Sequence, residues 1–202
     1  MPDELVALLT SNPATAGLVI EAAIPEMTTQ LDHFGGEPRN HDLVILGHAR
    51  EQRVLIAVEA KADESFGKPI HEELELAKPN SKVPDRIGLL SLSIFGQPID
   101  GDLGYLRYQL LHGLAGTLIE AKKQQADIAV FVVHEFISSE TTPANVARNN
   151  ADFTEFIRSF AGFSRVSVEA GRLISGIRVP GGPYVPSDVP VLIGKVATNL
   201  GW

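Results

Sequence analysis

The alternation of apolar and polar positions predicts three strands in the first third of the chain. Residues 26–31 alternate in polarity and include two β-branched threonines, and residues 41–46 form a second, more apolar run. Residues 54–60 are apolar on both faces until Glu59, which is typical of a strand in the middle of a covered sheet. The polar residues 47–53 predict a hairpin connection between the last two strands.

Helical periodicity predicts a long helix over residues 106–124, where leucines recur along one stripe. Its glycines, Gly113 and Gly116, would let this helix lie close against the sheet. A short helix is predicted over residues 3–9, and a second over residues 13–23, where a proline occupies the first turn. Further helices are predicted over residues 70–77, 84–95 and 145–161.

The remaining apolar segments add β-structure to this order. Residues 127–134 form a fourth, fully apolar strand. β-structure is also expected at residues 166–168, 173–179 and 189–196. The order of helix, three strands, long helix and strand predicts an α/β fold, with a central mixed sheet flanked by helices and a C-terminal β-rich extension.

The length and composition narrow the class of protein. A chain of 202 residues fits one domain of ~100–200 residues, and 44% apolar with 21% charged residues excludes a largely disordered chain. Without cysteine, disulfide scaffolds, thiolate zinc sites, iron–sulfur clusters and cysteine nucleophiles are excluded. Met1-Pro2-Asp3-Glu4 lacks the bases of a signal peptide, and no apolar run approaches the ~20 residues that cross a bilayer. We therefore expect a single-domain cytoplasmic protein without a membrane partner.

The net charge of −8 is unevenly distributed. Residues 1–75 hold 14 acids and 5 Lys or Arg, a balance of −9, whereas residues 76–202 hold 11 acids and 12 Lys or Arg, a balance of +1. This distribution excludes a basic protein that coats a duplex, because phosphate contacts need an excess of Lys and Arg. It allows a carboxylate site around a cation in the N-terminal part.

Charged residues that could form an active site lie at the end of the third predicted strand. Glu59 and Lys61 point to one face because strand side chains alternate, and charges there are costly unless they are paired or bind something. If the hairpin tip lies near residue 50, Asp42 stands opposite position 58 or 59. Two carboxylates beside the Ala60 carbonyl are ligands typical of Mg²⁺. A structural alternative stays open, in which Asp42 is a turn residue and Glu59–Lys61 a structural pair.

The arrangement of Asp42 and Glu59-Ala60-Lys61 across a hairpin resembles the active-site signature of the PD-(D/E)XK nuclease superfamily. The predicted αβββαβ order matches the restriction-endonuclease-like core, although His41 replaces the proline of the superfamily's name. The resemblance covers about residues 13–137 and leaves residues 138–202 as the extension. Motifs similar to those of a family of bacterial nuclease-like proteins are Pro25-Glu26, Gly35-Gly36, Asn40-His41-Asp42-Leu43, Val58-Glu59-Ala60-Lys61, Glu64-Ser65-Phe66-Gly67 and Leu106-Arg107-Tyr108-Gln109-Leu110-Leu111-His112.

The resemblance implies metal-dependent hydrolysis of a phosphodiester with water as the nucleophile. Asp42 and Glu59 would bind Mg²⁺ or Mn²⁺, and Lys61 would assist the water. Nucleic acid is then the expected partner, DNA ahead of RNA, and homo-oligomer formation stays open. The alternative is a nuclease-like fold that does no chemistry and serves as a binding or assembly subunit, which the acidic N-terminal part favours.

The resemblance also implies two further site positions. In many superfamily members another acid joins the metal ligands, and the candidates are Glu21 and Glu26. Glu26 is preferred because it matches the Pro-Glu of the resembling family. Gln109 on the long helix is expected to complete the site. Each position has a structural alternative, as a solvated acid or as a glutamine that bonds to nearby backbone.

Overall fold

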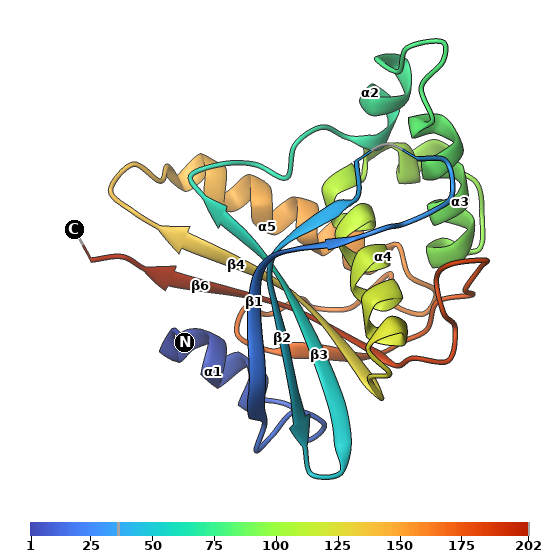
Figure 1. Cartoon of the computed structure of the whole chain (residues 1–202). Helices are drawn as coiled ribbons and strands as arrows, with labels where there is room; N and C mark the ends of the chain where they lie inside the picture. Colours follow the sequence, from blue (N-terminus) through green and yellow to red (C-terminus); the bar gives the residue numbers. More distant parts are fainter. Residues whose placement is uncertain (36, 202) are drawn as a thin grey trace.

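The computed structural model describes residues 1–35 and 37–201, which form a six-stranded mixed sheet flanked by helices (Figure 1). The strands are β1 (Val19–Thr29), β2 (Arg39–Ala49), β3 (Gln52–Ala62), β4 (Ile128–Ile137), β5 (Leu173–Ile177) and β6 (Val191–Asn199). The helices are α1 (Asp3–Thr10), α2 (Ile70–Glu75), α3 (Val83–Phe95), α4 (Tyr108–Lys123), α5 (Pro143–Arg158) and the 3₁₀ helix η1 (Gly101–Tyr105).

The strands lie in the order β1-β2-β3-β4-β6-β5. The β1–β2, β2–β3 and β5–β6 pairs are antiparallel, whereas β4 is parallel to both β3 and β6. The C-terminal part thus extends the central sheet by two strands. The predicted α/β architecture, with a central mixed sheet flanked by helices, is confirmed, whereas the part after residue 137 contains α5 as well as the two strands and is not specifically β-rich.

The predicted hairpin is confirmed in its position and its register. β2 and β3 are joined by a tight turn at Arg50, and their last pair towards the open end is Leu43 with Val58. Asp42, the next residue of β2, therefore lies beside position 59, as the sequence predicts. This register holds because β3 is buried on both faces, and a slip by one residue would move every side chain to the other face.

The helix predicted over residues 13–23 is wrong. Residues 11–17 form turns, in which the buried Thr15 hydroxyl donates to the carbonyl of Leu9, and β1 begins at Val19. β1 pairs with β2 along most of its length, and this pairing outweighs the helix propensity of the alanines in the segment. The strand predicted to begin at residue 26 is the second half of β1, and residues 166–168 form no strand.

Helices cover both faces of the sheet. α1 lies on one face, where Leu5, Leu8 and Leu9 pack against β3, β4 and β6. The larger core lies on the other face, beneath α3, α4 and α5 (Figure 1). Leu55 and Ala57 point into this larger core, and Glu59 continues the same alternation towards the end of β3.

α4 lies close to the sheet because of its two glycines. A Cβ atom at Gly113 would lie 2.8 Å from the ring of Phe131 on β4, and one at Gly116 would lie 2.9 Å from the ring of His41 on β2. The predicted role of these glycines is confirmed. The same approach places Arg39 and His41 beneath α4, because β2 bends towards this helix beyond the end of its pairing with β3 (Figure 1).

Candidate functional site

Asp42 lies at the point where β2 and β3 separate. Its Oδ2 atom accepts a hydrogen bond from the backbone N–H of Ala60 at 2.7 Å. The ladder between the two strands ends one residue earlier, at Leu43 and Val58, so the carboxylate takes the place of a strand hydrogen bond. This contact fixes Asp42 beside the end of β3.

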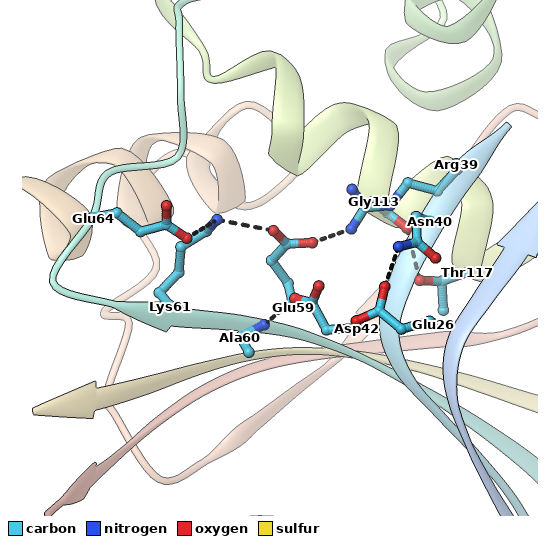
Figure 2. Close-up of polar contacts among 10 residues, drawn as sticks. All are labelled: Glu26, Arg39, Asn40, Asp42, Glu59, Ala60, Lys61, Glu64, Gly113 and Thr117. Carbon is cyan, nitrogen blue, oxygen red and sulfur yellow. Dashed lines mark hydrogen bonds and ion pairs between the residues drawn. The ribbon is translucent and has the colours of Figure 1, made fainter. Parts of the chain in front are cut away.

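Glu59 and Lys61 are buried on one face of β3, with 2% and 4% of their surfaces exposed. The Nζ atom of Lys61 lies 3.0 Å from Oε1 of Glu59 and 3.2 Å from Oε1 of Glu64 (Figure 2). The prediction that Glu59 and Lys61 share a face is confirmed. Two buried charges at the end of an apolar strand are tolerated here because they are paired.

Arg39 is a third charged residue of this site that the sequence reasoning missed. Its Nη2 atom forms an ion pair with Oε2 of Glu59, and the arginine is 7% exposed. It approaches Glu59 from β2, below α4, and its guanidinium lies 3.7 Å from the position of a Cβ atom on Gly113. Both carboxylate oxygens of Glu59 are therefore occupied by cations, one from Arg39 and one from Lys61 (Figure 2).

The pKa of the Asp42 carboxyl is raised, first by its burial and also by the negative charge of Glu59. The hydrogen bond from Ala60 and the positive charges of Arg39 and Lys61 act in the opposite direction. The two carboxylates are thus close enough to interact, and Figure 2 shows them beside one another above the sheet. Their repulsion is offset by Arg39 and Lys61, which both pair with Glu59.

Glu26 and Glu21 lie at different ends of β1. Glu26 accepts a hydrogen bond from the side chain of Asn40, the second residue of β2, and lies between the β1–β2 pairs that flank Asp42 (Figure 2). Glu21 instead pairs with His48, with Oε1 and Nδ1 3.0 Å apart near the hairpin turn. Of the two acids, Glu26 is therefore the one near Asp42. Its positive φ of 52° marks a local distortion of β1.

Gln109 is the second residue of α4 and is half-buried. It lies one helical turn before Gly113, on the side of α4 that Arg39 approaches. Within the described part of the chain, Gln109 makes no side-chain hydrogen bond to Asp42, Glu59 or Lys61. Its role at the site stays a prediction.

A second buried ion pair lies next to Lys61 on the neighbouring strands β4 and β6. Nζ of Lys195 on β6 lies 2.8 Å from Oε2 of Glu135 on β4 and donates to Asn150 of α5 at 2.6 Å. Glu135 is the register partner of Lys61. The sequence reasoning missed this pair because Glu135 and Lys195 lie on strands far apart in the sequence, and only the parallel register brings them together.

The donor set of Asp42 and Glu59 fits a divalent cation in its chemistry. Two carboxylates at the end of a strand, with the Ala60 backbone beside them, offer the oxygen ligands that Mg²⁺ and Mn²⁺ prefer. Residues 1–35 and 37–201 contain no cluster of three or more His, Asp or Glu that could hold a metal ion. A cation would thus take one oxygen of Glu59 that Arg39 or Lys61 now occupies.

Comparison with known proteins places the chain in a family. Residues 1–200 match the model described as Domain of unknown function (DUF6946). The chain belongs to this family. No curated protein and no solved structure matches it. In the part of the chain that the structure describes, no helix has the length and apolar character needed to cross a membrane.

Proposed function

We propose that the protein is a metal-dependent phosphodiester hydrolase with a restriction-endonuclease-like core. The observation that carries this proposal is the convergence of Asp42, Glu59 and Lys61 where β2 and β3 separate. Asp42 and Glu59 supply oxygen ligands, and Lys61 supplies a positive charge on the same face. This combination is suited to a phosphate group, whose negative charge increases at the reacting oxygens.

Each residue has a distinct part in the proposed reaction. A bound Mg²⁺ or Mn²⁺ would supply Lewis acidity and lower the pKa of a coordinated water. Lys61 holds the water through the one ammonium donor that does not pair with Glu59 or Glu64, and its positive charge offsets that of a phosphate oxygen. The water oxygen bonds to phosphorus and gives up one proton to the solvent, the bond from phosphorus to one sugar oxygen breaks, and that oxygen takes up a proton from the solvent. Gln109 and Glu26 support the site in the same proposal.

The proposed substrate is nucleic acid in the cytoplasm, DNA ahead of RNA. The excess of acids in residues 1–75, the part of the chain that contains Asp42 and Glu59, does not favour long-range attraction of a duplex. Recognition must therefore depend on close contacts at the cleavage point, where the metal offsets the carboxylates. A duplex-coating mode remains excluded.

A second candidate function is a binding or assembly subunit that does no chemistry. The ion pair between Arg39 and Glu59 favours it, because a buried carboxylate that is neutralised by two cations needs no metal. The two functions differ in one measurable property. A hydrolase of the proposed type needs a divalent ion at Asp42, whereas the binding subunit folds and binds without one.

Asp42→Asn is expected to abolish stabilisation of the protein by Mn²⁺. Wild type should gain about 2.7 kcal/mol of unfolding free energy at a Mn²⁺ concentration one hundred times the dissociation constant, because the ion binds the folded state. The side-chain oxygen of the asparagine can still accept the hydrogen bond from the Ala60 N–H. Burial of the Asp42 carboxylate raises its pKa, and the neutral asparagine removes that cost, so the fold is retained. Thermal melts with and without Mn²⁺ measure the difference.

Asp85→Asn is the matched control for this experiment. Asp85 is an exposed acid in the first turn of α3, paired with Lys82 just before that helix. This variant should keep the full Mn²⁺ effect. Equal Mn²⁺ stabilisation of wild type and Asp42→Asn would place the ion elsewhere, and no cleavage of single- or double-stranded DNA or RNA by wild type with Mn²⁺ would favour the binding subunit.

A further inference from the structure

The two cations that hold Glu59 are attached to the fold in different ways. Lys61 is on the same strand as Glu59, pairs also with Glu64, and lies 6.0 Å above the ring of Phe66. These contacts hold its ammonium group whether or not Glu59 is free. Lys61 therefore keeps its place when a ligand takes an oxygen of Glu59.

The guanidinium group of Arg39 has its polar contact through Glu59 alone among the described residues. Within the described residues, Glu59 is its sole ion-pair partner, and its buried Nε atom has no hydrogen-bond partner. The rest of the side chain packs against α4, where Gly116 faces its Cγ atom. A buried guanidinium N–H without an acceptor costs free energy, so this position of Arg39 is less favourable than one in which all its donors are paired.

The guanidinium of Arg39 also lies close to the proposed metal position, because it pairs directly with Oε2 of Glu59. Asp42 lies beside position 59, one residue beyond the last β2–β3 pair of Leu43 with Val58. A divalent ion shared by Asp42 and Glu59 would therefore meet this positive group. Arg39 and such an ion would place two positive charges at Oε2 of Glu59, and their repulsion opposes simultaneous contact.

We infer that Arg39 competes with the divalent metal for Oε2 of Glu59 and thereby sets the metal affinity of the site. This inference rests on the proposed metal-dependent function and adds a residue that controls loading. The metal must break the Arg39–Glu59 pair in order to bind, so the free energy of that pair is subtracted from the binding free energy of the metal. The protein with Arg39 in place should therefore bind metal weakly, and removal of the guanidinium should tighten binding.

Titration with Mn²⁺ alone, followed by calorimetry, tests this inference on the full chain. Arg39→Gln should bind Mn²⁺ roughly tenfold or more tightly than wild type, because a charge-assisted hydrogen bond no longer opposes the ion. Arg39→Lys keeps a cation without the planar fork and should fall between the two. Equal or weaker binding by both variants would overturn the inference.

Arg86→Gln is the matched control. Arg86 is also a buried arginine in an ion pair, with Nε 2.5 Å from Oδ2 of Asp32, but it lies outside the Asp42–Glu59 site. Its loss should leave the Mn²⁺ affinity at the wild-type value. The same gain in Arg86→Gln as in Arg39→Gln would show a general effect of loosening the fold and would contradict competition.

Folding of the variant supplies a second measurement. Loss of Arg39 leaves Glu59 with one cation, so Arg39→Gln is expected to be less stable without metal. If it is unfolded, Mn²⁺ should restore its circular dichroism spectrum, and should fail to do so in Arg39→Gln with Asp42→Asn. Failure of Mn²⁺ to restore the single variant would overturn the inference.

Cleavage assays distinguish this inference from the proposed function. Tighter Mn²⁺ binding by Arg39→Gln with no cleavage of DNA or RNA by wild type supports competition and overturns the hydrolase. Cleavage by wild type with unchanged Mn²⁺ affinity in Arg39→Gln supports the hydrolase and overturns competition.

Discussion

Lys61→Met is expected to lower metal-dependent cleavage by a factor on the order of 10²–10⁴ while the protein stays folded. Methionine keeps an apolar stem of similar length beside Phe66 and removes the ammonium group that would hold the water and the phosphate. Glu59 remains paired with Arg39 in this variant, so no buried carboxylate is left without a cation. The loss is therefore specific to chemistry, and cleavage of single- and double-stranded DNA and RNA with Mn²⁺ measures it.

Lys82→Met is the matched control for Lys61. Lys82 is an exposed lysine that pairs with Asp85 three residues along the chain, as Lys61 pairs with Glu64. Its replacement should leave cleavage at the wild-type rate. If Lys61→Met cleaves as fast as Lys82→Met, the proposed role of Lys61 is wrong.

Acid is expected to destabilise the fold through two buried histidines, His41 beneath α4 and His112 on α4 itself. Burial lowers the pKa of His41 to about 4 and that of His112 to about 3, and the positive charge of Arg39 acts in the same direction. Both rings are neutral in the folded protein but take up a proton near pH 6.5 when it is unfolded. The unfolded state thus binds more protons than the folded state below pH 6.5. The free energy of unfolding therefore decreases as the pH is lowered.

The expected loss begins below pH 6.5 and continues until each folded pKa is reached, near pH 4 for His41 and near pH 3 for His112. Within this window each histidine removes about 1.4 kcal/mol of unfolding free energy per pH unit. Urea denaturation at pH values from 8 to 4 measures the slope. Above pH 6.5 neither histidine contributes to it.

His41→Asn should reduce the pH dependence of the unfolding free energy by the contribution of one histidine, about 1.4 kcal/mol per pH unit. The Nε2 atom of His41 is buried without a partner, so its removal breaks no hydrogen bond of that atom. His48→Asn is the control, because His48 lies on the same strand with 43% of its side chain exposed. A wild-type slope in His41→Asn would show that His41 is protonated in the folded protein.

Much of the central fold could be predicted from the sequence because its signals are local. β3 is an apolar run between a polar turn and a charged end, and the short connection to β2 restricts the register to one or two residues. The error at residues 13–23 has a different origin. β1 is half exposed at the sheet edge, so its pattern is weak, and its pairing with β2 decides its conformation.

The candidate site was predictable for the residues that the hairpin brings together. Asp42 and Glu59 meet because two strands joined by a tight turn must align, and Lys61 shares the face of Glu59 through the two-residue period of a strand. Arg39 was not predictable in the same way. Its contact with Glu59 depends on the bend of β2 beyond the ladder and on Gly113 of α4, which is distant in the sequence.

The central claim is that Asp42 and Glu59 hold a divalent metal. X-ray diffraction at the manganese absorption edge, from crystals of the full chain soaked in Mn²⁺, tests it most directly. The account predicts an anomalous peak within bonding distance, about 2.1 Å, of oxygens of both Asp42 and Glu59, with the guanidinium of Arg39 moved away from Glu59. A site without a peak at saturating Mn²⁺, with Arg39 still paired to Glu59, would contradict it.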